Sequence, residues 1–276
     1  LGLWFVGHKL WQKEDTRTPG GLLIAAAVGM VPLIVFGFQL ASNSWMGLEA
    51  PGNYQSFYTY IKGGWVSVDG RVVEDPAHLV SGEAVLIDPA AQLETVEPAT
   101  VLLHKPVEYD ANLDGIKPAF ALITAKNRVA DDHSGIRMLK RHMTGQKVMC
   151  QLGYLCSGLQ VYTQDYRVER KLTKELSHLE QEYFIDVEGD IIEHGLKRLN
   201  HGLIHDGQPL APCKVSWQSD HRLRFALKKP QPGQIEWMCE QVGLQVTAMK
   251  LQRLGRISVA GLQPGQWRYM YPDERF

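Results

Sequence analysis

A serine–glycine pair followed by an alternating run of residues constrains this chain more than any other feature. Ser157-Gly158 predicts a turn, and residues 159–163 (Leu-Gln-Val-Tyr-Thr) have the alternation of a half-buried β-strand. Gln164 and Asp165 close that strand, and Asp165 is placed to cap the charged helix that the following residues predict. The centre of the chain is therefore expected to fold as a turn, a strand and a helix in succession.

The complete segment from Gln151 to Asp165 reads Gln-Leu-Gly-Tyr-Leu-Cys-Ser-Gly-Leu-Gln-Val-Tyr-Thr-Gln-Asp. It resembles the active-site segment of the RNA pseudouridine synthases of the small-subunit and large-subunit rRNA type, which reads G-R-L-D-x-D-T-S-G-L-L-L-x-T-N-D. Aligned on Ser157-Gly158, Gln151 stands where the family has Arg, and Gly153 stands where it has its catalytic Asp. The resemblance therefore includes the fold signature and lacks the catalytic carboxylate.

Other family motifs follow in the expected order over residues 60–272. Residues 101–106 resemble a strand that runs into the pattern N-K-P-x-G; they include Lys105, while His104 replaces the Asn and Glu108 replaces the Gly. Residues 181–187 resemble K-E-Y-x-V-x-V, which places Tyr183 at the position of the tyrosine that stacks on the target uracil.

The last motif lies in residues 234–238, where the family reads N-R-Q-I-R-R-M. Gln234 matches this pattern, but Glu236 stands where the family has the Arg that pairs with the catalytic Asp. The resemblance implies a cleft lined by Gln151, Ser157, Gly158, Gln234 and Glu236, with Tyr183 as its stacking surface.

The implied fold is α+β: a mixed, largely antiparallel sheet flanked by helices, as in the pseudouridine synthases. We expect that domain over residues 101–276, after a linker over 89–100. Residues 53–88 resemble part of an S4 RNA-binding lobe, because Asp69-Gly70 predicts a hairpin between two short strands. The basic residues of the S4 first half are missing here.

The first 52 residues have a different character, and they look unrelated to the rest. Residues 21–40 contain no charged side chain, which predicts a transmembrane helix; a buried helix of a soluble protein is the alternative. Lys9, Lys13 and Arg17 precede the segment and would place its N-terminal flank in the cytoplasm, so that later residues would lie outside. This conflicts with the cytoplasmic location that an RNA-related domain implies, unless residues 21–40 only associate it with the inner membrane. The chain begins at Leu1, and it is interpreted as a fragment.

Basic residues are concentrated in the C-terminal part, although the whole chain has 29 basic and 30 acidic side chains. A basic stretch precedes the central segment and a basic helix face follows it, and both are compatible with phosphate contacts, although a solvated helix face is the alternative. The residues expected to bind RNA are Lys105, Arg137, Lys140, Arg141, Arg167, Arg170 and Lys174. The expected partner is structured RNA, in particular rRNA, and we expect a monomer.

We expect neither a metal nor a cofactor. The four cysteines have no C-x-x-C spacing and are interpreted as free, buried thiols in a reducing compartment. His194, His201 and His205 are not completed by a carboxylate or thiol at a metal-binding spacing.

Uridine isomerisation requires a carboxylate nucleophile that a positive partner keeps ionised, and neither group is at its family position. Two hypotheses follow. One is a non-catalytic RNA-binding relative; the other is an active synthase whose nucleophile has moved, with Asp131 and Asp132 as candidates. A third is a membrane-associated protein with a vestigial RNA-binding domain.

Overall fold

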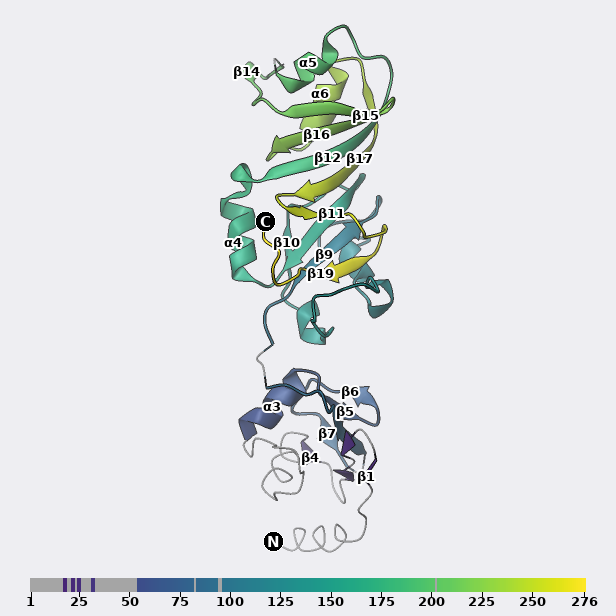
Figure 1. The fold of residues 1–276 in the computed structure, drawn as a ribbon, viewed down its shortest axis with the longest axis vertical. Coiled ribbons are helices and arrows are strands. Elements are labelled where there is room, and N and C mark those ends of the chain that lie inside the picture. The colour runs from purple at the N-terminus through teal and green to yellow at the C-terminus, as the bar shows by residue number, and fades with distance from the viewer. Residues whose placement is uncertain are drawn as a thin grey trace, which may run out of the picture. The chain divides into compact units, whose positions relative to one another are not determined.

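The computed structural model describes residues 54–81, 83–93, 96–201 and 203–276, together with four two-residue strands nearer the N-terminus (Figure 1). The chain divides into two compact units. The smaller unit contains residues 1–97 and 139–143, and the larger unit contains residues 98–138 and 144–276.

A nine-stranded sheet forms the larger unit, in the order β15-β16-β12-β17-β11-β9-β19, with β10 on β11 and β18 on β17. All of its strand pairs are antiparallel except β11 with β17, which confirms the predicted mixed, largely antiparallel sheet. The strands are β9 (Thr100–Lys105), β10 (Lys147–Met149), β11 (Cys156–Thr163), β12 (Glu180–Glu188), β15 (Lys214–Ser219), β16 (Arg222–Lys228), β17 (Gln245–Leu254), β18 (Ile257–Ser258) and β19 (Trp267–Tyr269).

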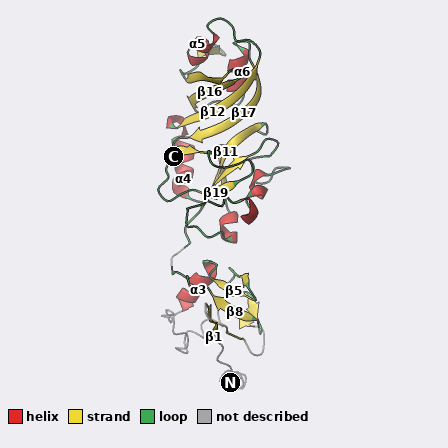
Figure 2. Ribbon diagram, turned by 45° about the vertical axis from the view of Figure 1, so that its right-hand side comes forward, coloured by secondary structure: helices red, strands yellow, loops and turns green. Residues whose placement is uncertain are grey.

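Few helices accompany this sheet (Figure 2). α5 (Gly195–Asn200) and α6 (Gln234–Glu240) pack against the strands at the β15 end, and α4 (Tyr166–Lys174) packs beside β10 and β11. In α6, Ile235, Met238 and Cys239 are buried because their spacing places them on one helix face. Short 3-10 helices and one hairpin complete the larger unit: η1 (Ala119–Leu122), η2 (Ala125–Asn127), η4 (Leu176–His178), β13 (Ile204–His205) and β14 (Gln208–Pro209). The 3-10 helix η3 (Lys140–Met143) belongs to the smaller unit.

The predicted succession of strand and helix is confirmed. The Asp165 side chain accepts a hydrogen bond from the backbone N–H of Arg167, which makes it the N-cap of α4. The predicted basic helix over 166–179 is shorter, since α4 ends at Lys174 and η4 follows. Residues 140–143 form only the short 3-10 helix η3, and Ser134 and Ile136 before it lie in turns held by side-chain hydrogen bonds.

Gly158 has a conformation that only glycine adopts without strain. Its φ is +114°, and a Cβ there would lie 2.2 Å from the carbonyl oxygen of Leu251. The parallel register of β11 and β17 pairs these two residues, so the two backbones approach closely at this point. The serine–glycine pair of the sequence is therefore required by strand packing in the centre of the sheet.

The smaller unit has its own apolar core, in which Phe57, Ile61, Val66, Val80 and Val85 are buried. Its elements are α3 (Tyr54–Lys62), β5 (Val66–Val68), β6 (Arg71–Val72), β7 (Leu79–Val80) and β8 (Ala84–Ile87). Asp69 (φ 47°) and Gly70 (φ 75°) form the turn between β5 and β6, as predicted.

The continuous helix expected over residues 21–40 is not found at the residues of that segment that the structure describes. These lie in β2 (Gly21–Leu22), β3 (Ile24–Ala25) and β4 (Val31–Pro32); the rest of the expected helix lies outside the described residues. β2 pairs with β1 (Arg17–Thr18), β3 with β8 and β4 with β7. An uncharged run indicates burial but not secondary structure, and here the described pieces pair as strands. Nor does any helix in the described part of the chain have the length and apolar character needed to cross a membrane.

Candidate functional site

Near the start of β11, side chains from β9, β11, β12 and α6 lie close enough to shift one another's pKa values. Burial raises the pKa of the Tyr183 phenol on β12, and the nearby Cys156 and Glu236 add to this effect. Burial also raises the pKa of Cys156, to about 11, while Lys105 on β9 acts in the opposite direction. Electrostatic effects weaken with distance, so these shifts indicate that the fold brings Tyr183, Glu236 of α6 and the start of β11 near one another.

Tyr183 lies on the core-facing side of β12 and is only 8% exposed. Its hydroxyl donates a hydrogen bond of 2.8 Å to Oε1 of Gln181, the residue that replaces the family's Lys. In this state little of the ring is open to a stacked base.

Gly153 lies in the exposed loop just before β11, at the family's catalytic position. A Cβ added there would meet no atom within 4 Å. The loop itself is fixed: the carbonyl of Gly153 accepts the N–H of Cys156 at 3.1 Å, and the carbonyl of Tyr154 accepts the N–H of Glu108 at 2.9 Å. The site thus has an ordered backbone and space for a side chain, but no carboxylate.

Glu236 is exposed on α6, and it makes no ion pair with any other residue that the structure describes. The other predicted cleft residues have local contacts. Gln234 accepts the N–H of Gln231 at 3.0 Å at the start of α6, and Ser157 donates to the carbonyl of Met249 at 3.3 Å. Gln151 is exposed at the start of the loop. The hydrogen bonds of Gln234 and Ser157 thus stabilise local backbone structure.

Lys105 does not fit the prediction that it contacts RNA phosphates. Its side chain is fully buried, and its ammonium group donates to the carbonyl oxygens of Pro106 at 3.0 Å and Tyr154 at 3.5 Å. Burial lowers its pKa, while Cys156 and Asp110 act in the opposite direction. Lys105 therefore holds the loop next to Gly153 from beneath, and the sequence alone gave no sign that this charge points inward.

The loop near Gly153 also exposes apolar side chains that the sequence analysis did not single out. Tyr154 is 54% exposed and Leu155 is 72% exposed. Glu108, whose N–H anchors Tyr154, has a φ of 61°, which explains why the family has Gly at this position. Glu108 in place of the family's Gly was the only sign in the sequence that this part of the loop is unusual.

Asp131 and Asp132 lie far from Tyr183 in the sheet. Asp132 accepts hydrogen bonds from Arg128 Nε at 2.7 Å and from the backbone N–H of Tyr269 on β19 at 3.2 Å. Between β19 and β12 the sheet order has three strands, so the two positions are about 19 Å apart at about 4.8 Å per step. Asp131 is exposed and lies 2.9 Å from His133.

The predicted basic residues are divided between the two units. Lys140 and Arg141 belong to the smaller unit, where their N–H groups donate to the carboxylate of Glu74. On α4, Arg167 pairs with its neighbour Asp165 at 2.9 Å, and Arg170 and Lys174 are exposed on that helix. Arg137 is exposed and belongs to the larger unit.

All four cysteines are free thiols, as expected. Cys156 and Cys239 are buried, and Cys150 and Cys213 are half-buried. Burial raises the pKa of Cys150 and Cys239 to about 12 and that of Cys213 to about 11. At neutral pH these groups are protonated and weak nucleophiles.

Curated proteins with similar sequences are RNA pseudouridine synthases. An uncharacterized RNA pseudouridine synthase of Aquifex aeolicus is 23% identical over 220 residues, which cover 78% of this chain and 85% of the relative. The ribosomal large subunit pseudouridine synthase B of Bacillus subtilis is 24% identical with the same coverage. The dual-specificity RNA pseudouridine synthase RluF of Escherichia coli is 27% identical over 117 residues, 42% of this chain and 40% of the relative.

A solved structure described as a pseudouridylate synthase has a similar fold. Its TM-score is 0.53 at 15% sequence identity, and the match covers 84% of this chain and 94% of the other. No family model matches the sequence.

Proposed function

Because this chain belongs to the RNA pseudouridine synthase family, we propose that it is a member that binds structured rRNA and does not convert uridine to pseudouridine. Its role would then be to hold RNA by the surfaces that the enzymes use for their substrates. Its place of action would be the cytoplasm, where rRNA is assembled, and no cofactor is needed.

The environment of Gly153 is the observation that carries this proposal. The family's nucleophile position has open space and an ordered backbone, but no side chain. Glu236, at the position of the family's Arg, is an acid that could not stabilise a neighbouring carboxylate, because like charges disfavour ionisation. Both requirements for the covalent step are therefore unmet.

The alternative of a relocated nucleophile has weaker support at Asp131 and Asp132. Asp132 uses its carboxylate to bind Arg128, Ser134 and Tyr269, and the sheet separates it from Tyr183. The carboxylate that does influence Tyr183 is that of Glu236. If the chain is active, Glu236 is the better candidate.

The test is carbodiimide or mass-based mapping of pseudouridine in rRNA transcripts incubated with the full chain. We expect RNA binding without conversion of any uridine. Conversion at one position would overturn the proposal of a non-catalytic protein, and loss of that conversion in Glu236→Gln, but not in Asp132→Asn, would assign the displaced nucleophile.

A further inference from the structure

The strands β15, β16, β12 and β17 have two different faces. On β12, Gln181, Tyr183, Ile185 and Val187 are buried beneath α5 and α6, as is the face of β16 that includes Phe225. The residues that alternate with these point away from the helices. This opposite face, which we call the charged face, contains Lys214, Arg222, Arg224, Lys228, Lys250 and Arg253, with the acids Glu180, Glu182, Asp186 and Glu188 among them.

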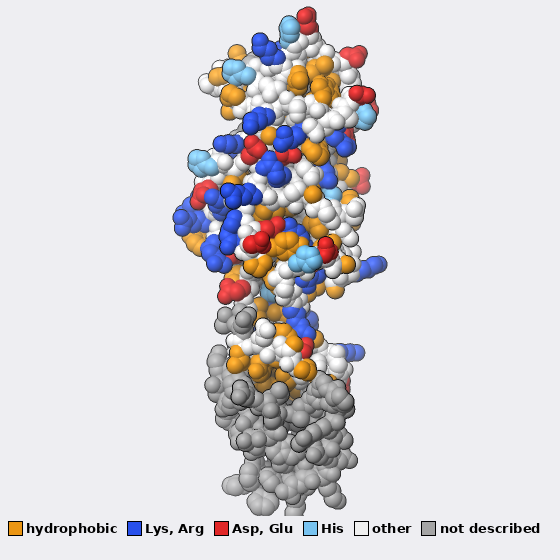
Figure 3. Space-filling model, in the orientation of Figure 1, with side chains coloured by type: hydrophobic (Ala, Val, Ile, Leu, Met, Phe, Trp, Pro, Cys, Tyr) orange, Lys and Arg blue, Asp and Glu red, His pale blue; other side chains and the backbone are white. Residues whose placement is uncertain are grey.

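Strand register aligns these residues in rows across the sheet. Asp186 is opposite Arg222, and Phe184 lies between Arg224 on one side and Lys250 on the other. Figure 3 shows blue side chains, with red ones among them, over the strands that Figure 1 labels β16, β12 and β17. Charges that are far apart in the sequence thus share one exposed surface.

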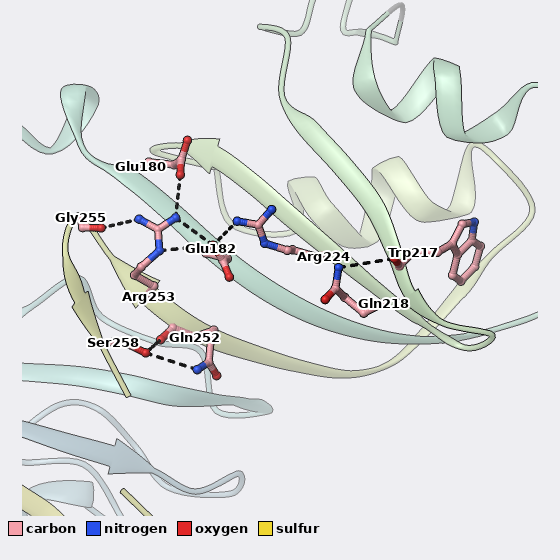
Figure 4. Close-up of polar contacts among 9 residues, drawn as sticks. All are labelled: Glu180, Glu182, Trp217, Gln218, Arg224, Gln252, Arg253, Gly255 and Ser258. Atoms are coloured by element: carbon pink, nitrogen blue, oxygen red, sulfur yellow. Dashed lines mark hydrogen bonds and ion pairs between the residues drawn. The ribbon is translucent and has the colours of Figure 1, made fainter. Parts of the chain in front are cut away.

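Three of the four acids of the charged face, Glu180, Glu182 and Asp186, are already paired. Arg253 bridges Glu180 at 2.7 Å and Glu182 at 2.8 Å, and Arg224 binds Glu182 as well (Figure 4). Arg222 pairs with Asp186 through two hydrogen bonds. The arginines are therefore held in place by their carboxylates, a geometry that fixes the planar guanidinium groups on the sheet.

The three lysines of the charged face have no such partner. Lys214, Lys228 and Lys250 make no ion pair with any other residue in the part of the chain that the structure describes. Partial burial lowers the pKa of Lys250, and the neighbouring charge of Arg222 adds to this effect. Six basic groups against four acidic ones leave a net positive surface that complements a polyanion.

We propose that the charged face binds the phosphodiester backbone of the structured RNA, with Lys214, Lys228 and Lys250 as direct phosphate contacts. This inference rests on the proposed function and adds to it a second RNA-contacting surface, on the face of the sheet opposite Tyr183. It also explains why the basic side chains of α4, of which Arg167 and Lys171 are paired with Asp165 and Glu175, need not carry the binding alone.

The experiment compares two triple variants of the full chain. One is Lys214→Gln/Lys228→Gln/Lys250→Gln, and its matched control is Lys117→Gln/Lys126→Gln/Lys197→Gln, three exposed lysines outside the charged face. Affinity for a transcribed domain of large-subunit rRNA is measured over a range of salt concentrations. Each phosphate contact contributes roughly 0.7 to 0.9 to the slope of log affinity against log salt.

We expect the charged-face variant to lose about 2 to 3 from that slope and roughly tenfold to hundredfold in affinity at low salt, and the control to keep the slope. A Lys→Arg triple variant at the same positions should restore binding, which separates loss of charge from misfolding. An unchanged slope in the Gln variant, while the unmodified protein binds RNA, would overturn the charged face alone and leave the proposed function intact. No RNA binding by the unmodified protein would overturn both.

Discussion

Gly153 and Gly158 lie in the same short segment, yet the structure constrains them in opposite ways. At Gly158 a Cβ would collide with the backbone of Leu251, and φ is +114°. At Gly153 a Cβ would meet nothing within 4 Å. A side chain at Gly158 would force β11 and β17 apart, whereas the loop at Gly153 has space for a side chain. The same motif therefore contains one position that the fold requires and one that only chemistry would require, which is why the fold persists without the catalytic Asp.

The largest expected effect is on catalytic rate, when a carboxylate is introduced at Gly153. Gly153→Asp together with Glu236→Arg would supply a carboxylate and the cation that keeps it ionised. Loss of a nucleophile costs several powers of ten in rate, so we expect pseudouridine formation to rise about 100-fold or more over the unmodified protein, measured on rRNA transcripts.

Either change alone should leave the rate at background. In Gly153→Asp the new carboxylate would share its site with Glu236, which raises its pKa and keeps it protonated more often. In Glu236→Arg no nucleophile exists. Equal activity of the single and double variants would contradict the assignment of these two positions.

The comparison is tested directly by the same substitution at both glycines. Gly158→Ala should lower the free energy of unfolding by about 3 kcal/mol or more, from backbone collision and a left-handed φ. Gly153→Ala should change it by less than about 1 kcal/mol, in the stabilising direction because the unfolded chain loses freedom. Urea denaturation measures both, and similar midpoints would show that β11 and β17 can separate at low cost.

Asp132→Ala tests whether a carboxylate far from the loop has a structural role. Its removal leaves Arg128 and two backbone N–H groups without their acceptor, and we expect a loss of about 3 kcal/mol in unfolding free energy. Asp131→Ala is the control; its carboxylate is exposed, so the change should stay within about 0.5 kcal/mol.

The effect of Asp132 should also depend on pH. Burial acts to raise its pKa, but the hydrogen bonds from Ser134, Arg128 and Tyr269 lower it overall. A group with a depressed folded pKa stabilises the fold above its unfolded pKa of about 3.9, and this contribution disappears as the pH falls through the folded pKa. The difference between the unmodified protein and Asp132→Ala should therefore shrink below about pH 4. A difference in unfolding free energy that stays constant down to pH 2 would mean that the negative charge of Asp132 does not contribute to stability.

The smallest effect is expected at Glu108, which stands where the family has glycine. Glu108→Gly removes the cost of φ 61° and should stabilise the protein by up to about 1 kcal/mol in thermal or urea unfolding. Glu108→Ala keeps a Cβ and should bring no gain, so equal stability of both variants would count against strain at this position.

The parts of the fold with local signals could be predicted from the sequence. Asp69-Gly70 required a two-residue turn and Asp165 a helix cap, and both are found where the residues placed them. These features depend on backbone conformation or on neighbours in the sequence. That position 153 has no carboxylate could also be read from the sequence, because it depends on the identity of a single residue. The turn predicted at Ser157-Gly158 is wrong, because both residues lie within β11.

Features that depend on tertiary contacts could not be read in this way. Lys105 gave no sign that its ammonium group is buried, and residues 21–40 suggested a helix by length although their described parts pair as strands. The charged face was missed because it is assembled from β12, β15, β16 and β17 by register, so its residues form no run or helical stripe. Sequence proximity directed the expectation to α4 instead.

The raised pKa values of all four cysteines have a practical consequence for labelling the loop that contains Gly153. With pKa values raised to about 11 or 12, the native thiols should react slowly with maleimides at neutral pH. A cysteine introduced by Gly153→Cys, in open solvent, would be the fast-reacting group. A fluorophore or spin label attached there would report on whatever enters the site from the position that the missing carboxylate would occupy.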